Sequence, residues 1–195
     1  MNPLEKSVFR WPQMPPLPPP NQAVLIRAAT PPSRKAASLE LRKVLRQVLA
    51  VWSGLLPEQL PLLETPRGPV WPGQFAGQPL GISLSYCESK GWIGFFRGGA
   101  IGIDAMPAAS IPEAEAVARH YLGPAAWAEI QRAQNPARAF ALAWTNLEAR
   151  LKCLKCELTE WAADQNSAFR NEAAQSAFFC DGTVVTVATV SIAEK

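Results

Sequence analysis

Proline constrains this chain more than any other residue, because it fixes one backbone dihedral and has no amide N–H to donate. Seven of the chain's 19 prolines lie in residues 1–22. That density excludes a helix or a central strand and predicts a polyproline-like arm. The arm is expected either to be disordered in solvent or to cover the opposite half of the protein. A second stretch, Pro57–Gly81, is rich in proline and glycine and is predicted to be largely loop.

Between and after these stretches, the first half of the chain predicts strands and one helix. Residues 23–28 form a short apolar run typical of a strand, and Pro31-Pro32-Ser33 begins a helix that runs to about Leu55. Its apolar residues recur at three- and four-residue spacing and predict a buried stripe: Leu41, Val44, Leu45, Val48 and Leu49. Three strand-like runs then follow, separated by turn signals, at 81–86, 92–97 and 100–104. This pattern is typical of an antiparallel meander.

The second half repeats the order of strand, helix and hairpin. Helices are predicted at 111–121, 125–133 and 136–158, and a hairpin of 177–180 with 183–192 around Asp181-Gly182. The fold class is therefore α+β, with two similar lobes. The expected divisions are a proline-rich arm (1–22), an N-terminal lobe (23–98) and a C-terminal lobe (99–195). The polar interval 162–176 carries no clear pattern.

Composition narrows the class of protein. With 48% hydrophobic and 18% charged residues, the 195-residue chain can bury a real core. No apolar run is long enough to cross a bilayer and no secretory signal begins the chain, so a cytoplasmic protein without membrane contact is expected. The spacing of Cys153 and Cys156 suits a redox or zinc site, but no second Cys or His pair accompanies it, which favours a structural role. The single histidine, His120, makes a Ser–His–Asp site improbable and is expected on a helix surface.

The net charge of +3 is unevenly distributed. Five basic residues gather in one helical segment: Arg34, Lys35, Arg42, Lys43 and Arg46. They indicate either an anionic ligand or an ordinary solvated helix face. Nucleic acid is disfavoured, because no aromatic residues alternate with these charges and no binding motif is present.

Two short segments carry the chemistry. Asp104 follows an apolar run and is expected at a strand end, and Glu148 and Lys152 are four residues apart on one helix face. Two carboxylates suit magnesium, and an amine beside them suits phosphate oxygens. Glu148 is also a candidate to accept the proton of an attacking hydroxyl. The plain alternative is a helical Glu–Lys pair with no catalytic role.

The same segments carry a family resemblance. The order SLSYCES (83–89), AIGIDAM (100–106) and AWTNLEARLKCL (143–154) resembles the larger, single-chain 4′-phosphopantetheinyl transferases. Members of that family typically carry the motifs Ser-His-Ser, then Gly-Ile-Asp-x-Glu, then Trp-x-x-Lys-Glu-Ala-x-x-Lys. The upstream helix and the Arg67-Gly68-Pro69 turn also fall where that family has a helix and a Gly-Lys-Pro turn. The similarity covers roughly residues 23–190.

The resemblance implies a monomeric pseudo-dimer of two α+β lobes with coenzyme A in the cleft between them. Such enzymes transfer the phosphopantetheine arm of coenzyme A to a serine of an acyl or peptidyl carrier protein. By position, Asp104 and Glu148 are the implied Mg²⁺ ligands, with Glu148 and Lys152 catalytic. The candidate coenzyme A contacts in this sequence are Arg34, Lys35, Arg46, Arg67, Ser85 and Tyr86.

Three positions depart from the family pattern. Tyr86 replaces the histidine that contacts a coenzyme A phosphate, Met106 replaces a second carboxylate, and Leu147 replaces a lysine. Each change removes a charge or a metal ligand, although some working members carry Met at the second place. A second hypothesis is therefore a weak or inactive homologue that binds coenzyme A or a carrier protein.

Overall fold

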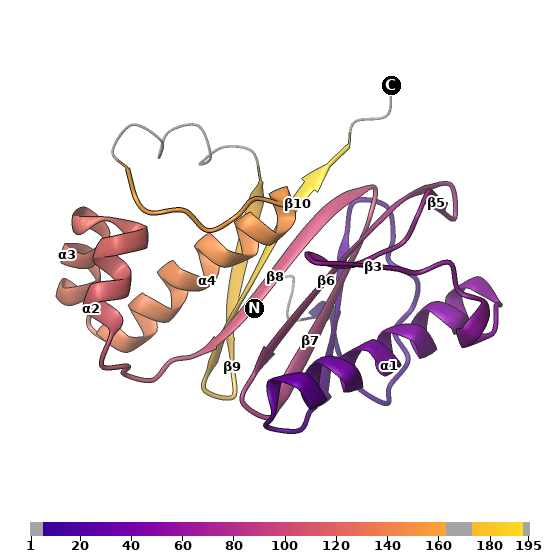
Figure 1. Cartoon of the computed structure of the whole chain (residues 1–195), viewed down its shortest axis with the longest axis horizontal. Helices are drawn as coiled ribbons and strands as arrows, with labels where there is room; N and C mark the ends of the chain where they lie inside the picture. Colours follow the sequence, from indigo (N-terminus) through magenta and orange to yellow (C-terminus); the bar gives the residue numbers. More distant parts are fainter. Residues whose placement is uncertain (1–5, 163–172, 193–195) are drawn as a thin grey trace.

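The computed structural model describes residues 6–162 and 173–192, and the unpatterned interval 162–176 lies mostly outside these ranges. Two sheets form the centre of the molecule, with helices on their outer sides (Figure 1). The first sheet has the order β1-β2-β7-β6-β5 and the second has the order β8-β10-β9. This arrangement confirms the predicted α+β class.

The first sheet is built on the expected strands. β2 (Ala23–Ala29), β7 (Lys90–Arg97) and β6 (Gln78–Cys87) pair antiparallel, with β1 (Val8–Arg10) and β5 (Gln74–Phe75) at the edges. α1 (Arg34–Ser53) begins at Ser33, whose hydroxyl caps the amide of Ala36, and ends at Gly54 in the left-handed region. Its predicted apolar stripe is fully buried on this sheet.

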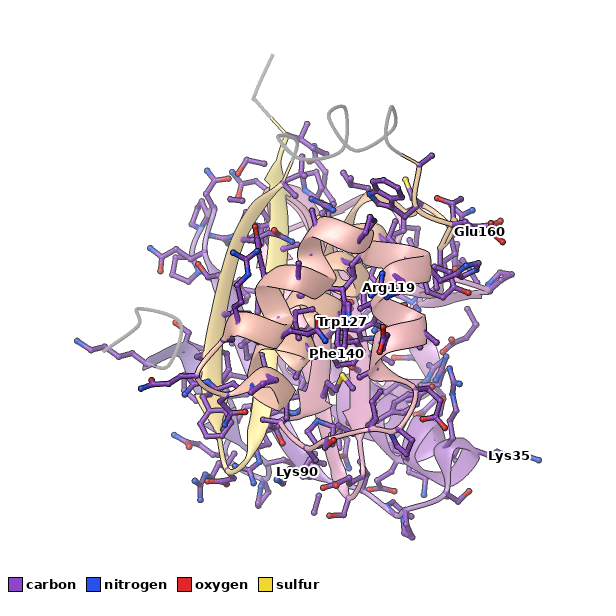
Figure 2. All side chains as sticks on the ribbon, turned by 90° about the vertical axis from the view of Figure 1, so that its left-hand side faces the viewer. Lys35, Lys90, Arg119, Trp127, Phe140 and Glu160 are labelled. Carbon is purple, nitrogen blue, oxygen red and sulfur yellow. The ribbon has the colours of Figure 1, made fainter. Side chains whose placement is uncertain are left out.

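The second sheet lies beneath the remaining helices. β8 (Gly99–Pro107) pairs with β10 (Thr183–Ser191), which pairs with β9 (Ala174–Cys180), all antiparallel. α4 (Pro136–Leu154) packs on β8 and β10, through Ala149, Cys153 and Ala188 among others. The short α2 (Ala114–Val117), the π-turn η3 (Ala118–Leu122) and α3 (Pro124–Arg132) pack at the far side of α4, where Trp127 and Phe140 share a small core (Figure 2).

The inner faces of the two sheets pack against each other. Leu25, Trp92 and Phe96 of the first sheet share one cluster with Ile101, Ile103, Val185 and Val187 of the second. β6 of the first sheet and β8 of the second lie side by side without backbone pairing. Instead, the backbone amides of Ile103 and Ala105 donate hydrogen bonds to the hydroxyls of Ser83 and Ser85, respectively. Side chains of β6 thus join the two sheets.

The predicted three-strand meander is therefore wrong in its last strand. β6 and β7 form the expected hairpin, but β8 leaves the first sheet for the second. The reason lies in Gly98-Gly99. Gly98 has φ of 107°, and a Cβ on Gly99 would lie 1.9 Å from the carbonyl oxygen of Val190. The two glycines redirect the chain between the sheets instead of closing a hairpin.

The described part of the proline-rich arm is ordered against the first half. β1 pairs parallel with β2, Trp11 and Leu17 pack against the core beneath α1, and the Trp52 indole donates to the carbonyl of Pro15 (3.0 Å). The arm therefore covers its own side of the protein, and both expectations for it were wrong. The proline content limited the arm to one short edge strand, as predicted.

The helices of the second half follow the predictions with small shifts, but the Pro57–Gly81 stretch is not largely loop as predicted. It contains the 3-10 turn η2 (Pro57–Gln59), the two-stranded pair β3 (Leu63–Thr65) and β4 (Gly68–Val70), β5 and the start of β6. All four cysteines are free, and burial raises the pKa of Cys153 to about 11, which fits the structural role predicted for it. No helix in the described ranges is long and apolar enough to cross a membrane.

Candidate active site

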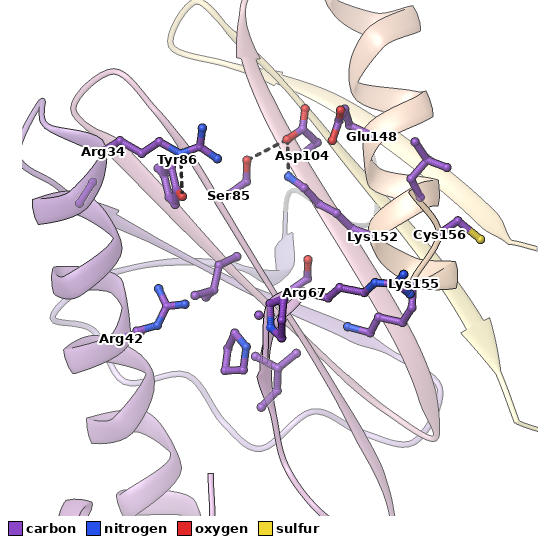
Figure 3. Close-up of a pocket in the computed structure, with 18 of the residues that line it drawn as sticks. Arg34, Arg42, Arg67, Ser85, Tyr86, Asp104, Glu148, Lys152, Lys155 and Cys156 are labelled. Atoms are coloured by element: carbon purple, nitrogen blue, oxygen red, sulfur yellow. Dashed lines mark hydrogen bonds and ion pairs between the residues drawn. The ribbon is translucent and has the colours of Figure 1, made fainter. Parts of the chain in front are cut away.

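A cavity of about 690 Å³ opens between the two halves of the molecule. α1 and β6 form one wall, and β8 and α4 form the other (Figure 3). Five basic side chains line it: Arg34, Arg42, Arg67, Lys152 and Lys155. Three acidic ones also line it: Glu88, Asp104 and Glu148. The lining has a net positive charge and suits an anionic ligand.

Asp104 lies on β8, on the face opposite the core. Its neighbours Ile103 and Ala105 point between the two sheets, and the strand alternation turns Asp104 toward the cavity. Only 8% of Asp104 is exposed. Contrary to the prediction, it does not end its strand, because β8 continues to Pro107 along β10. Asp104 is thus held by a paired strand rather than by a loop.

Two donors hold one oxygen of Asp104. The Ser85 hydroxyl donates to Oδ1 at 3.0 Å, and the Lys152 ammonium donates to the same oxygen at 2.7 Å (Figure 3). The ammonium also donates to the carbonyl of Ile103 at 3.2 Å. These bonds join β6, β8 and α4 at a single carboxylate.

A glycine lets α4 approach β8 closely. A Cβ on Gly102 would lie 1.8 Å from the carbonyl oxygen of Ala149 and 2.4 Å from the amide of Cys153. Both α4 residues are buried there. The close contact brings Glu148 and Lys152, on either side of Ala149, over the strand that carries Asp104.

Glu148 shares the cavity with Asp104. Burial raises the pKa of the Glu148 carboxyl, the charge of Asp104 raises it further, and Lys152 partly offsets both effects. The two carboxylates therefore interact electrostatically across the α4–β8 contact. A carboxyl whose pKa is raised in this way is better suited to accept a proton near neutral pH.

The donor set also fits a divalent cation. Within the described ranges, no group of three or more His, Cys, Asp or Glu side chains is arranged to hold a metal ion. Magnesium often binds through one or two carboxylates, with waters and substrate phosphates completing its shell. Asp104 and Glu148 are such a pair, and a cation between them would relieve the repulsion that raises the pKa of Glu148.

Arg34 and Tyr86 form one end of the cavity. The Arg34 guanidinium lies 5.6 Å from the Tyr86 ring centroid and donates to its hydroxyl at 3.3 Å. Arg34 is the first residue of α1, so its charge lies beside the positive end of the helix dipole. The structure thus provides a cation beside the tyrosine, at the position where the resemblance has a histidine.

The opposite end is formed by Arg67 and Lys155. Arg67 lies in the β3–β4 turn and forms a 3.5 Å ion pair with Glu157. Burial lowers the pKa of Lys155, and Arg67 lowers it further. Two neighbouring cations that repel each other are a favourable site for an added anion.

Seven of the nine predicted site residues line this cavity, namely Arg34, Arg67, Ser85, Tyr86, Asp104, Glu148 and Lys152. Lys35 and Arg46 do not. Lys35 points away from the body of the molecule (Figure 2), and Arg46 donates to the carbonyl of Pro57. On a helix, residues one and twelve positions after Arg34 fall on other faces, so charge density alone could not separate them.

Two further cations in the cavity were missed. Arg42 is eight residues after Arg34, about 80° around the helix, so its spacing alone does not distinguish it from Lys35. It forms an ion pair with Glu64 at 3.0 Å. Lys155 had no sequence signal either. It enters the cavity because α4 ends there with Lys155 in the left-handed region, at φ of 57°.

The other two departures from the family pattern lie outside the cavity. Met106 packs against α2, η3 and Trp127 in the small core beside α4. Leu147 lines a second, apolar cavity on an adjacent face of α4. Neither residue places an uncharged side chain among the basic residues that line the first cavity.

The comparisons agree with these motifs. No curated protein sequence matches the chain. A family model described as the 4′-phosphopantetheinyl transferase superfamily matches residues 100–188. The match begins in β8, ends in β10, and includes Asp104, Glu148 and Lys152. Residues 100–188 are thus similar to the 4′-phosphopantetheinyl transferase superfamily, which supports the family that the motifs predicted.

Proposed function

We propose that the protein transfers the 4′-phosphopantetheine arm of coenzyme A to a serine hydroxyl of an acyl or peptidyl carrier protein. The observation that carries this proposal is the convergence of Asp104, Glu148 and Lys152, all in the family-matched segment, with Arg34, Arg42 and Arg67 from the other half. Coenzyme A has a pyrophosphate and a 3′-phosphate, so it needs several cations in one cavity. A volume of about 690 Å³ is in the range of small-molecule sites.

In this reaction the serine oxygen attacks the phosphorus next to the pantetheine. The bond from that phosphorus to the bridging oxygen breaks, and adenosine 3′,5′-bisphosphate leaves with that oxygen. Glu148 accepts the serine proton, directly or through water, and its raised pKa supports this role. Lys152 lies 2.7 Å from Asp104, one of the two proposed Mg²⁺ ligands. From there its charge would lie beside the transferred phosphate.

Mg²⁺ is part of the proposal. Asp104 and Glu148 would hold it, and it would neutralise charge on the pyrophosphate and the leaving group. Ser85 orients Asp104 through the hydrogen bond to Oδ1, and Arg34 with Tyr86 would bind a phosphate of coenzyme A. Lys35 and Arg46 lie outside the cavity and are not part of this proposal.

We also propose that the two halves form a pseudo-dimer, because each half packs one long helix over one sheet and the cavity lies between them. One chain contributes both walls, which supports a monomer. The four free thiols are typical of the cytoplasm.

Mass spectrometry tests the activity directly. The protein is incubated with coenzyme A, Mg²⁺ and a panel of apo carrier proteins, and a phosphopantetheine adduct on a carrier serine is expected. Asp104→Asn and Glu148→Gln are expected to lower the rate at least about 100-fold while the fold is retained. The matched control is Glu129→Gln, an exposed change on α3 that should leave the rate unchanged.

The second candidate function is a binding module without turnover. It rests on Leu147 and Met106, two positions where the family pattern has a charged residue and this chain does not. It predicts coenzyme A binding, measured by calorimetry, without an adduct on any carrier. An adduct on a single carrier would exclude it.

A further inference from the structure

Two buried hydroxyl groups join α4 to the second sheet behind the first cavity. Thr145 of α4 and Thr186 of β10 are both fully buried, and their hydroxyl oxygens lie 2.8 Å apart. Neither residue lines the cavity that contains Asp104 and Glu148. We name these two residues the threonine pair. The proposed function has so far given the pair no role.

The threonine pair lies next to both carboxylates. Thr186 is the direct partner of Asp104 in the β10–β8 ladder, so the two side chains stand on one face of the sheet with their Cβ atoms about 5 Å apart. Thr145 precedes Glu148 by three residues, which is about 4.5 Å along the helix axis. The pair therefore ties together the two elements that carry the carboxylates, at positions beside those side chains.

The neighbouring acceptors give the bond between the two hydroxyls its direction. The Thr186 hydroxyl donates to Oδ1 of Asn146 at 3.3 Å, so its oxygen can accept the proton of Thr145. The carbonyl of Leu142, at 3.2 Å, is a second and longer acceptor for Thr145. The backbone carbonyl of Asn146 accepts from the side-chain amide of Gln175 on β9 at 2.7 Å. One turn of α4 is thus bonded to both β10 and β9.

Stability alone does not account for two hydroxyls at this position. A buried hydroxyl without a partner is costly, and an apolar pair of the same shape is about as stable as a hydrogen-bonded pair. Threonine is also a weaker helix former than alanine or leucine. A hydrogen bond differs from an apolar contact in its direction, because it weakens steeply when its angle departs from the ideal. The threonine pair therefore specifies where α4 lies more than how tightly it is held.

The threonine pair and Gly102 hold α4 at two points. Ala149 packs against Gly102 of β8, and Thr145 lies one turn earlier on nearly the same helix face. The glycine contact sets the distance of α4 from β8, and the hydrogen bond sets the rotation of α4 over β10. Glu148 lies between the two points in the chain. A rotation of α4 would therefore move its carboxyl group relative to Asp104.

We propose, resting on the proposed function, that the threonine pair positions the two carboxylates that would hold Mg²⁺. Its residues lie outside the cavity and act through Asp104 and Glu148. They keep α4 in register with β8 and β10, so that both carboxylates can bind one divalent cation. Loss of the bond between the hydroxyls should weaken metal binding and slow the transfer, while the fold is retained.

Electron paramagnetic resonance of Mn²⁺ tests the pair with two variants of Thr145. Thr145→Val keeps the shape and removes the hydroxyl, so the Mn²⁺ affinity and the transfer rate are expected to fall about tenfold. Thr145→Ser keeps the hydroxyl but leaves a methyl-sized void. It should unfold at a lower temperature than Thr145→Val and yet bind Mn²⁺ within about twofold of the wild type. Affinities that follow the order of thermal stability would overturn the proposal.

A double-mutant cycle shows whether the two hydroxyls act as one unit. Thr186→Val should change the Mn²⁺ affinity less than about twofold when Thr145→Val is already present, because both changes remove the same bond. Losses that multiply would overturn the pair. The matched control is Thr189→Val, the same change on the same strand but on the face turned away from α4. It should keep the wild-type affinity, and near-ultraviolet circular dichroism checks that each variant is folded.

The outcomes separate this proposal from the proposed function. The expected order of Mn²⁺ affinities, without a phosphopantetheine adduct on any carrier, would support the threonine pair and count against the transfer. Adducts formed at the wild-type rate by Thr145→Val, with unchanged Mn²⁺ affinity, would overturn the pair and leave the proposed function standing. A wild-type protein that binds no Mn²⁺ would overturn both the pair and the proposed metal site.

Discussion

At the scale of single residues, Asp104 is where the two halves of the molecule meet chemically. Ser85 from β6 and Lys152 from α4 both donate to Oδ1. A carboxylate that is 8% exposed needs such partners, because burial without them is costly. The same contacts orient the carboxylate toward the cavity. Structure and proposed chemistry therefore depend on one side chain.

Lys152 and a divalent cation would compete for Asp104. Lys152→Met removes the ammonium that donates to Oδ1, so the affinity for Mn²⁺ without coenzyme A is expected to rise, by about tenfold at most. The same change should weaken coenzyme A binding, since one cation is lost. Electron paramagnetic resonance of Mn²⁺ measures the first effect and calorimetry the second. Weaker Mn²⁺ binding would show that Lys152 orients the carboxylate instead.

Glu148 is predicted to make stability depend on pH. Its pKa is raised in the folded state by burial and by Asp104, so the folded protein binds its proton more tightly than the unfolded chain does. The contribution of Glu148 to stability is therefore greatest below the unfolded pKa of about 4.5 and is lost as pH rises through the folded pKa.

Glu148→Gln should remove that dependence and stabilise the protein at pH 7.5 without metal. Urea unfolding at pH 4.5 and 7.5 measures it, with Glu129→Gln as the exposed control. A variant that is less stable than the wild type at pH 7.5 would contradict the assigned cause.

At the scale of elements, the contact of α4 with β8 decides whether the site exists. α4 lies close enough that the Gly102 position faces the backbone of Ala149 and Cys153. The backbone cannot move aside like a flexible side chain. The position of α4 therefore depends on Gly102, which lies on β8 two residues before Asp104.

Gly102→Ala is expected to destabilise the protein by about 3 kcal/mol or more, because its methyl group would overlap Ala149. Gly54→Ala is the comparison. Gly54 has open space around it but φ of 72°, so only backbone strain of about 1 kcal/mol is expected. Thermal unfolding measures both variants. Similar losses would mean that α4 can shift away from β8 at little cost.

The end of α4 shows what element prediction could not reach. Its apolar pattern predicted a helix to residue 158, but it ends at Leu154, with Lys155 in the left-handed region. No glycine marks this end. The Lys155 amide donates a hydrogen bond to the carbonyl of Lys152, and the Cys156 amide donates one to the carbonyl of Leu151. The early end brings Lys155 into the cavity.

At the scale of the whole molecule, the β9–β10 turn fastens the second half to the first. Arg27 of β2 forms an ion pair with Asp181, and Lys90 of β7 donates to the carbonyl of Asp181 at 2.7 Å. Arg27 also lies over the ring of Trp92, with 5.9 Å to the centroid. These contacts lie beside the inter-sheet core, on the face of the first sheet that α1 does not cover.

Asp181→Asn should loosen this fastening without unfolding either half. Hydrogen exchange at the β9–β10 turn is expected to become faster, and Glu115→Gln, which removes an ion pair within the second half, should leave it unchanged. Arg27 holds the pKa of Asp181 below its usual range, so its stabilisation is present above about pH 3.8 and is lost as pH falls through the folded pKa. Unchanged exchange would show that the core alone joins the halves.

By itself, the sequence determined most of the local elements and seven of the residues that line the first cavity. Helical spacing predicted the buried face of α1, strand alternation and turn residues predicted β6, β7, β9 and β10, and motif order predicted the family. These features depend on residues near one another in the chain. Periodicity and turn chemistry record such local preferences directly.

The tertiary structure decided what lies beside what. It placed β8 in the second sheet, turned Lys35 and Arg46 away from the cavity, and added Arg42 and Lys155 to it. It also separated Leu147 from Glu148: Leu147 lines the second, apolar cavity, and Glu148 lines the first, charged one. Such outcomes depend on close approach between distant segments, as at Gly99 and Gly102. No local pattern along the chain encodes the distance between two strands or the face a helix turns to its neighbour.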